Sequence, residues 1–287
     1  MQTLELLLEP QCKLVIFPEG GCSFQNDTVM PFRPGAVQLG LQALARCAKR
    51  NQPIPDLYAV PLSLKYRYTG KMRPVIHQAL RQLEHALGIP PTGDDYQRLR
   101  QAAAKVLARC EQEHRVVPEP GASWNQRIAN LKAAVLYQCE NKLKLPHASE
   151  DPDRERVYRI RHALEQQRTI VLEDGADDWA ATSKALMRVL NFDAIYDGYV
   201  AEKPTPERFL DTLTRLEREV FGIDKPDPKG HRQAFLRIGR PMNLKDYVES
   251  YHRDRAATIT TVVQQLQQTV QTNLDMLAEA TARGISW

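Results

Sequence analysis

Several kinds of segment are missing from this 287-residue sequence, and each absence narrows what the chain can be. It has no apolar run near the roughly 18 residues that a membrane-spanning helix requires. Residues 1–10 lack the basic start of a signal peptide and carry Glu5 and Glu9 instead. The sequence therefore predicts a protein that is soluble or attached peripherally to a membrane.

Cysteine is scarce and follows no metal-binding pattern. The chain has five cysteines, with no C-x-x-C pair and no His/Cys cluster (Cys12, Cys22, Cys47, Cys110, Cys139). We therefore expect no metal site. We also expect reduced thiols in a cytoplasmic compartment, most of them buried as small hydrophobic side chains.

The sequence also lacks a large excess of charge of either sign. Thirty-nine basic residues face 35 acidic ones, a formal net charge of +4. A small positive balance suits an anionic substrate or a membrane surface. It gives no reason to expect a nucleic-acid partner.

Residues 1–66 have the alternating pattern of an α/β fold. A helix ends at Pro10, and the apolar run Lys13–Phe17 is typical of a strand buried on both faces. A polar loop follows, then a helix that begins at Pro34 with Val37, Leu41, Leu44 and Ala48 at helical spacing. A second buried strand is expected at Asp56–Tyr66, so the order of elements predicts a parallel sheet.

Between residues 71 and 230 the pattern is mostly helical. Three apolar stripes are each typical of a helix packed on one face: Tyr96, Leu99, Ala103, Val106, Cys110; Ile128, Leu131, Val135, Cys139; Phe209, Leu213, Leu216, Val220. Thr205 is a typical helix cap ahead of Pro206. Arg168–Asp174 suits a short strand or a helix end. The stretch Gln233–Tyr247 alternates like a strand, is stopped by Gly239 and Pro241, and leads into a long final helix. No internal repeat has a fixed period.

The loop after the first expected strand has the groups that bind a small anion. Gly20 and Gly21 allow a close approach of backbone amides, and the following helix start favours negative charge. Ser23 adds a hydroxyl, Arg33 a cation and Glu19 an acceptor. A phosphate-bearing polyol would satisfy this set, although a plain turn with a solvated Glu19 explains the spacing equally well.

These residues resemble a conserved block of the phospholipid and glycerol acyltransferases. Phe17-Pro18-Glu19-Gly20 with Ser23, and then the Pro31–Ala36 pattern, resemble the third block of that family. Leu57–Leu64 resembles the fourth block, and Leu236–Tyr247 the closing strand. Gly21 and Cys22 stand where the block usually has threonine and arginine, which leaves phosphate affinity open.

The resemblance implies a 1-acylglycerol-3-phosphate acyltransferase-like activity. Such enzymes pass an acyl group from acyl carrier protein or a coenzyme A thioester to glycerol 3-phosphate or its monoacyl derivative, at the cytoplasmic membrane surface. By position, Glu19, Gly20 and Ser23 would line the glycerophosphate acceptor site. Arg33 is a weaker addition, and Pro61 would shape the acyl site. No metal or redox cofactor is implied, because the acyl donor brings its own activation.

The catalytic motif of that family, His-x-x-x-x-Asp, is missing. It should precede Phe17, yet residues 1–16 contain no histidine, and none of the seven histidines has an aspartate five positions on. His114 has Glu119 at that offset, a match we attribute to chance. The catalytic residues are therefore unknown, and we expect a truncated chain, or a gene whose true start lies upstream, that does not turn over.

A basic segment follows the fourth block. Lys65–Pro74 contains four basic residues and no acid, with tyrosines between them (Lys65, Tyr66, Arg67, Tyr68, Lys71, Arg73). Such a loop suits anionic lipid or an acidic acyl carrier, and a solvated loop is the alternative.

The sequence thus predicts an α/β fold with a partial glycerophosphate acyltransferase-type sheet, flanking helices and a large, mostly helical insertion. Residues 1–70 would be a core remnant, 71–231 the insertion, and 232–287 the closing strand and C-terminal helix. A non-catalytic, degenerate acyltransferase that binds a lipid precursor or a protein remains the alternative function. A helical nucleic-acid-binding or scaffold protein is a third, weaker one.

Overall fold

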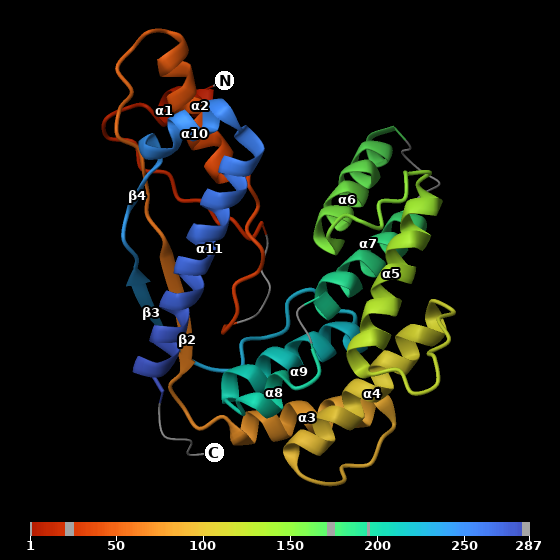
Figure 1. The fold of residues 1–287 in the computed structure, drawn as a ribbon. Coiled ribbons are helices and arrows are strands. Elements are labelled where there is room, and N and C mark those ends of the chain that lie inside the picture. Colours follow the sequence, from red (N-terminus) through yellow and green to blue (C-terminus); the bar gives the residue numbers. More distant parts are fainter. Residues whose placement is uncertain (1, 21–25, 171–175, 194–195, 283–287) are drawn as a thin grey trace. The chain divides into compact units, whose positions relative to one another are not determined.

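The computed structural model describes the chain except for residues 1, 21–25, 171–175, 194–195 and 283–287 (Figure 1). The described chain divides into two compact units. The first contains the residues up to Thr69 and those from Arg232 onward, and the second is Gly70–His231. Small strand pairs among many helices confirm a mixed α/β class with a large helical portion.

The first unit combines two short strand pairs with helices. Its elements are α1 Gln2–Leu6, α2 Gly35–Lys49, β1 Tyr58–Ala59, β2 Leu62–Tyr68, β3 Arg232–Ile238, β4 Met242–Asn243, the 3₁₀ turn η1 Leu244–Tyr247, α10 Val248–Arg253 and α11 Arg255–Ala280. Pro34 caps α2 rather than beginning it.

The strands pair antiparallel, so the predicted parallel sheet is wrong. β2 pairs with β3, from Leu62 opposite Ile238 to Tyr68 opposite Arg232, and β1 pairs with β4. Because the chain leaves this unit after β2 and re-enters it at β3, the two strands run in opposite directions. Their partners lie about 170 residues apart in sequence, beyond the reach of a local pattern.

The second strand is covered on one face only, rather than on both as predicted. α11 covers the first face, where the Ser63 hydroxyl donates to the Val270 carbonyl at 2.8 Å (Figure 1). The opposite face carries exposed aliphatic side chains from both strands (Leu62, Leu64, Leu236, Ile238). This alternation is typical of antiparallel sheets with one free face.

The apolar run Lys13–Phe17 is the clearest wrong prediction. It forms no strand, and Val15 and Phe17 are 79% and 82% exposed. An apolar run becomes a strand only when a neighbour pairs with its backbone. Among the described residues, none pairs with this segment.

The core of the first unit forms where α2 packs against η1, α10 and α11. Its buried side chains include Val37, Leu41, Leu44, Leu244, Val248, Tyr251 and Val262. The helical spacing expected in α2 is confirmed. Gly40 allows the close approach, because a Cβ there would lie 2.5 Å from Leu244 Cδ1.

The second unit is all helical in its described part. Its helices are α3 Arg73–Leu87, α4 Asp95–Glu113, α5 Trp124–Lys142, α6 Asp153–Ile170, α7 Ala176–Asp193, α8 Tyr199–Glu202 and α9 Pro206–Phe221. α6 runs to Ile170, which settles the first residues of Arg168–Asp174 as a helix end, and 171–174 lie outside the described residues. Thr205 caps α9 as predicted, accepting from the Arg208 N–H.

The three predicted apolar stripes form the helix contacts of this unit. Their buried members are Leu99, Val106, Cys110, Ile128, Leu131, Val135, Cys139, Phe209, Leu213 and Leu216. Tyr96, Ala103 and Val220 are partly buried. Four of the five cysteines are described, all as free thiols; Cys12 is exposed, and Cys47, Cys110 and Cys139 are buried as expected.

Three buried Glu–Arg pairs join successive helices at corresponding positions. Each glutamate lies in the last turn of one helix, and its arginine is the fourth residue of the next (Glu84–Arg98, Glu111–Arg127, Glu140–Arg156). Each guanidinium donates to both carboxylate oxygens, at 2.6–2.9 Å. The glutamates are 27 and 29 residues apart (84, 111, 140), so the motif recurs without a fixed period.

The helix ends of this motif are also alike. The residue four positions after each glutamate has a positive φ: Gly88 at 65°, Arg115 at 57° and Lys144 at 55°. The backbone N–H of the next residue donates a hydrogen bond to the backbone carbonyl of the glutamate, at 3.0, 2.8 and 2.9 Å in the three helices. This left-handed ending lets the chain reverse and places the next arginine opposite its glutamate.

Candidate functional site

The structure brings three of the five predicted site residues into one loop of the first unit. Residues 17–20 form a turn, with Gly20 N–H bonded to the Phe17 carbonyl at 3.1 Å and Gly20 at φ 70°. The Arg33 N–H donates to the Pro18 carbonyl at 2.8 Å, so Arg33 adjoins Glu19 and Gly20. Ser23 lies outside the described residues.

Glu19 braces this loop from within. Its Oε2 accepts the Met30 N–H at 2.9 Å, and the side chain is half-buried. The loop therefore closes on itself through Glu19 and through the Pro18–Arg33 hydrogen bond. Glu19 is therefore not the solvated side chain that a plain turn would have.

Two glutamines of α11 hold the same loop from outside. The Val29 N–H donates to Gln271 Oε1 at 2.8 Å, and the Phe32 N–H to Gln267 Oε1 at 2.9 Å. The Gln271 amide in turn donates to the Asp27 carbonyl at 3.2 Å. Sequence reasoning missed these braces, although the run of glutamines at 264–271 marks an unusual polar face on an otherwise apolar helix.

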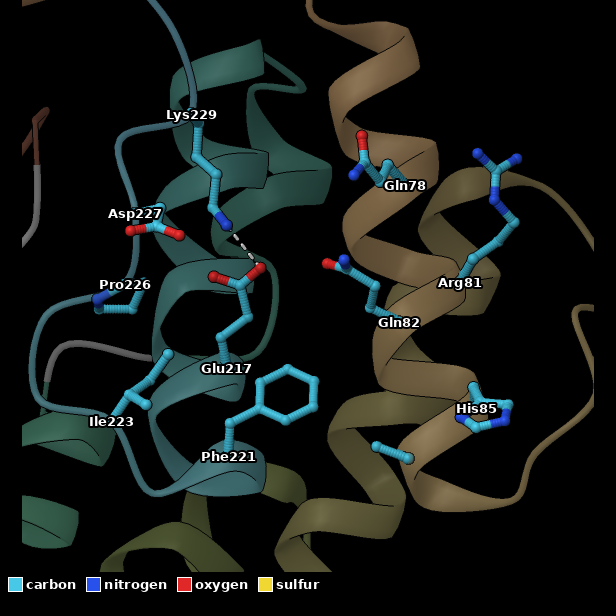
Figure 2. Close-up of a pocket in the computed structure, with 11 residues that line it drawn as sticks. Gln78, Arg81, Gln82, His85, Glu217, Phe221, Ile223, Pro226, Asp227 and Lys229 are labelled. Carbon is cyan, nitrogen blue, oxygen red and sulfur yellow. Dashed lines mark hydrogen bonds and ion pairs between the residues drawn. The ribbon is translucent and has the colours of Figure 1, made fainter.

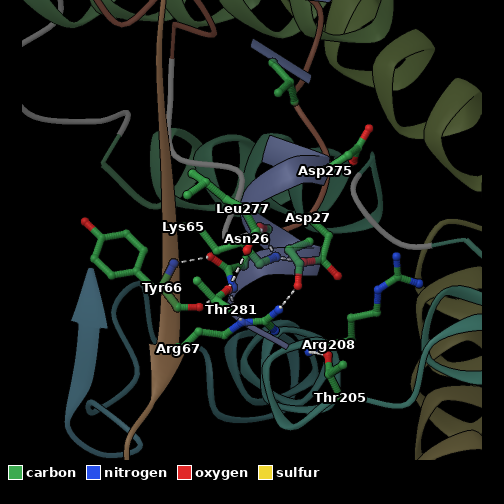
Figure 3. A network of polar contacts seen from close by, with 12 residues as sticks. Asn26, Asp27, Lys65, Tyr66, Arg67, Thr205, Arg208, Asp275, Leu277 and Thr281 are labelled. Carbon is green, nitrogen blue, oxygen red and sulfur yellow. Dashed lines mark hydrogen bonds and ion pairs between the residues drawn. The ribbon is translucent and has the colours of Figure 1, made fainter. Parts of the chain in front are cut away.

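A buried ion pair fixes the loop to β2. Lys65 is fully buried, and its ammonium pairs with Asp27 and donates to the Asn26 carbonyl at 3.0 Å (Figure 3). The Asn26 side chain bonds both backbone groups of Tyr66, at 2.6 and 2.8 Å. Removing either charge would leave the other buried without its partner.

The basic segment is therefore not the solvated or lipid-facing loop that we predicted at its start. Lys65 and Arg67 lie in β2 and point beneath α11, where Arg67 donates to the Ala278 carbonyl at 2.8 Å and to Thr281 at 3.0 Å (Figure 3). On the opposite face the Arg232 guanidinium lies 4.9 Å from the Tyr66 ring centre. The pairing of β2 with β3 fixes which way the side chains of Lys65 and Arg67 point, and the residues next to them in sequence do not reveal this pairing.

Pro61 lies in the short connection between β1 and β2 and has no hydrogen bond to the loop in the described chain. It is buried between β1 and β2, and its carbonyl accepts the Gly239 N–H at 2.8 Å. Gly239 packs closely against α11, because a Cβ there would lie 2.8 Å from Asn273 Nδ2 and 3.1 Å from Thr269 Cγ2. Whether Pro61 shapes an acyl site stays a prediction.

The loop and the start of α2 form a positively polarised surface. Pro34, the residue before α2, supplies no side-chain cap, and Gly35 at the start of the helix is exposed, as is Arg33. A helix amino end with an adjacent guanidinium attracts a phosphate or carboxylate. Gly20 is exposed and has a positive φ, a conformation that glycine adopts without strain.

No histidine–aspartate pair adjoins this loop among the residues that the structure describes. His114 lies in the second unit, where Arg188 donates to its Nε2 at 2.8 Å and Nδ1 contacts Gln138 at 2.7 Å. Both ring nitrogens are thus occupied, and no contact joins His114 to Glu119 in the described chain. This agrees with the chance match expected from sequence.

One histidine–aspartate contact lies elsewhere in the helical unit. His77 Nε2 is 2.9 Å from Asp95, a pair that no local spacing suggested. Asp95 also faces Arg73 at 3.8 Å and Arg98 at 3.6 Å. Because two guanidiniums share the carboxylate, this cluster reads as a helix–helix ion network.

The lengths of the described helices and the grouping of the described side chains bear on two classes of protein, membrane-spanning and metal-binding. None of the helices in the described chain has the length and apolarity to cross a bilayer. Within the same residues, no group of histidine, cysteine, aspartate or glutamate side chains is arranged to hold a metal ion.

The comparisons with known proteins point to one family. The Acyltransferase family model matches residues 1–65, which include the loop, α2 and the start of β2. Neither the curated proteins nor the solved structures gave a significant match. The family match supports acyl transfer as the general activity to which this part of the chain relates.

Proposed function

We propose that the first unit is the acceptor-binding part of an acyltransferase of phospholipid synthesis. Its acceptor would be glycerol 3-phosphate or 1-acylglycerol 3-phosphate, and its acyl donor a thioester of acyl carrier protein or coenzyme A. The observation that carries the proposal is that the Acyltransferase match falls on the loop in which Arg33, just before α2, donates to the Pro18 carbonyl of the turn that ends at Gly20. Activity at the cytoplasmic face of a membrane, with peripheral attachment, follows from such a substrate.

Each part of the loop suits one part of this acceptor. A phosphate group prefers backbone N–H groups at a helix start and a guanidinium, which Gly35 and Arg33 supply. Hydroxyl groups of the glycerol would meet the loop around Glu19. Cys22 leaves the loop without the arginine usual in the family, so Arg33 would carry the charge.

Acyl transfer also needs a base that takes the proton from the attacking hydroxyl. In the described loop, Glu19 accepts a backbone N–H and Asp27 pairs with Lys65. We therefore propose that the chain as given binds the acceptor without transferring an acyl group.

Calorimetric titration with glycerol 3-phosphate tests the binding step. Arg33→Gln should weaken binding about tenfold or more, the value of a hydrogen bond to a charged group. Arg50→Gln is the matched control, because Arg50 is exposed at the opposite end of α2. Equal binding by both variants would contradict the assigned phosphate site.

An acyl-transfer assay separates the two functional readings. With acyl-coenzyme A or acyl carrier protein as donor, we expect acceptor binding and no product. Product formation would refute the inactivity but support the enzyme class. Failure to bind any glycerophosphate, with or without an acyl chain, would refute the acceptor-binding proposal.

A further inference from the structure

A groove in the second unit contains an unexplained buried carboxylate. The groove lies between α3 and α9, is closed by the segment after α9, and has a volume of about 550 Å³ (Figure 2). Glu217 of α9 lines it and is only 3% exposed. Figure 2 shows this side chain between Gln82 of α3 and the segment that carries Asp227 and Lys229.

Only one oxygen of this carboxylate has a donor. The Lys229 ammonium donates to Glu217 Oε1 at 2.6 Å. Oε2 is buried and accepts no hydrogen bond from any described residue. Folded proteins rarely leave a buried carboxylate oxygen unpaired, because its lost hydration is not replaced. The geometry therefore calls for a donor that none of the described residues supplies.

The walls indicate what kind of molecule carries that donor. Phe221 and Ile223 line the groove and are 44% and 40% exposed, although both are large and apolar. Asp227, also on the wall, is an exposed second carboxylate with no ion pair in the described chain. The groove thus offers two acidic groups beside an aliphatic and aromatic surface.

We propose that this groove binds a primary alkylammonium group. The ammonium would face Asp227 and would reach Glu217 Oε2 once the side chains that cover this oxygen shift, while its alkyl chain lies on Ile223 and the Phe221 ring. A charged donor satisfies a carboxylate more strongly than a neutral one. Lys229 already shows that an ammonium reaches this carboxylate.

The cations near the groove leave room for this ligand. Lys229 is neutralised by Glu217 itself. Arg81 extends outward from α3, away from Glu217, as Figure 2 shows. The ligand's ammonium would therefore share the Glu217 carboxylate with Lys229, and Asp227 supplies the second negative charge that balances the two ammonium groups.

Such a group occurs on free diamines and on the lysine side chains of proteins. Both present the same chemistry to the groove, and the site is independent of the acyl-transfer proposal. Titration with 1,5-diaminopentane addresses the first source. Titration with an N-acetylated lysine amide, and with the same compound acetylated on its side-chain nitrogen, addresses the second.

The decisive experiment compares 1,5-diaminopentane with 1,5-pentanediol by calorimetry at constant ionic strength and pH 7.5. We expect saturable binding of the diamine or of the lysine amide, and none of the diol. Glu217→Gln should weaken that binding about tenfold or more, since one charge-assisted hydrogen bond is lost. Circular dichroism checks that the variant is folded.

Two surface variants keep the test valid if Glu217→Gln fails to fold. Asp227→Asn should weaken binding, whereas Asp224→Asn, an exposed aspartate nearby, should leave it unchanged. Lys229→Met should strengthen binding, because both oxygens of Glu217 become available to the ligand. Equal heats for diamine and diol, or unchanged binding in both Glu217→Gln and Asp227→Asn, would overturn the proposal and leave an ordered water as the donor.

Discussion

Glu140 should be the most sensitive single position in the helical unit. Its side chain is fully buried, and Arg156 donates to both of its oxygens at 2.9 and 2.8 Å. Arg159 adds a contact at 3.1 Å, and His147 one at 3.3 Å. Glu140→Ala would leave the Arg156 guanidinium, whose side chain is 6% exposed, without the carboxylate to which it donates both hydrogen bonds. Breaking such a buried pair costs about 3–5 kcal/mol.

Urea unfolding followed by far-ultraviolet circular dichroism measures this cost. A surface control in the same unit is Arg109→Ala, since Arg109 is 56% exposed in its i,i+4 pair with Glu113. That pair is worth about 0.3–0.5 kcal/mol. The reasoning is refuted if Glu140→Ala costs no more than Arg109→Ala.

The repeated pairs allow a graded version of the same experiment. Their arginine side chains are 6%, 11% and 22% exposed in the pairs of Glu140, Glu84 and Glu111. Alanine at the three glutamates should therefore destabilise in that order, largest first, because a more exposed arginine recovers more hydration. A reversed order would show that packing, and not the stranded charge, sets the cost.

Three further results are expected. Burial raises the pKa of the Glu140 carboxyl, but the hydrogen bonds and charge of Arg156 and its neighbours outweigh burial and hold that pKa below the ordinary 4.5. The stability that the ionised carboxylate gives is therefore lost as the pH falls below about 4.5. A plot of the free energy of unfolding against pH in the acid range should be flatter for Glu140→Gln than for the unmodified protein. Burial raises the pKa of the Cys110 thiol to about 12, whereas Cys12 is exposed. In a Cys22→Ser background, a thiol reagent at pH 8 should therefore label Cys12 quickly and Cys110 only on unfolding. Rapid labelling of Cys110 in the native protein would contradict its burial. Asp27→Asn should cost about 3–5 kcal/mol in urea unfolding, because it strands the buried Lys65 ammonium, and a cost below that of Arg109→Ala would refute the pair's role.

Helices were predicted well because their signals are local. The stripe through Leu99, Val106 and Cys110 and the cap at Thr205 depend only on residues three or four positions apart. A helix satisfies its own backbone, so such spacing suffices to specify it. The recurring Glu–Arg pairs escaped notice because their partners lie 14 or 16 residues apart and share only two residue types.

Strands were predicted poorly because their partners are remote. Leu64 pairs with Leu236, and nothing near either residue encodes that meeting. The same distance explains Lys65, which looked like part of a basic surface loop until α11 and Asp27 covered it. In the candidate site, the loop was found from its glycine and proline residues, whereas its braces from Gln267 and Gln271 were not.

The contacts of the candidate loop also decide how its chemistry should be tested. Glu19 and Asp27 are carboxylates of the described loop, and both have structural partners, Met30 N–H and Lys65. A carboxylate that holds a backbone N–H is a poor proton acceptor, because protonation would cost that hydrogen bond. If Glu19→Gln lowers affinity for glycerol 3-phosphate while the loop stays folded, Glu19 acts by shaping the site. Any acyl transfer would then need a base that neither of these side chains provides.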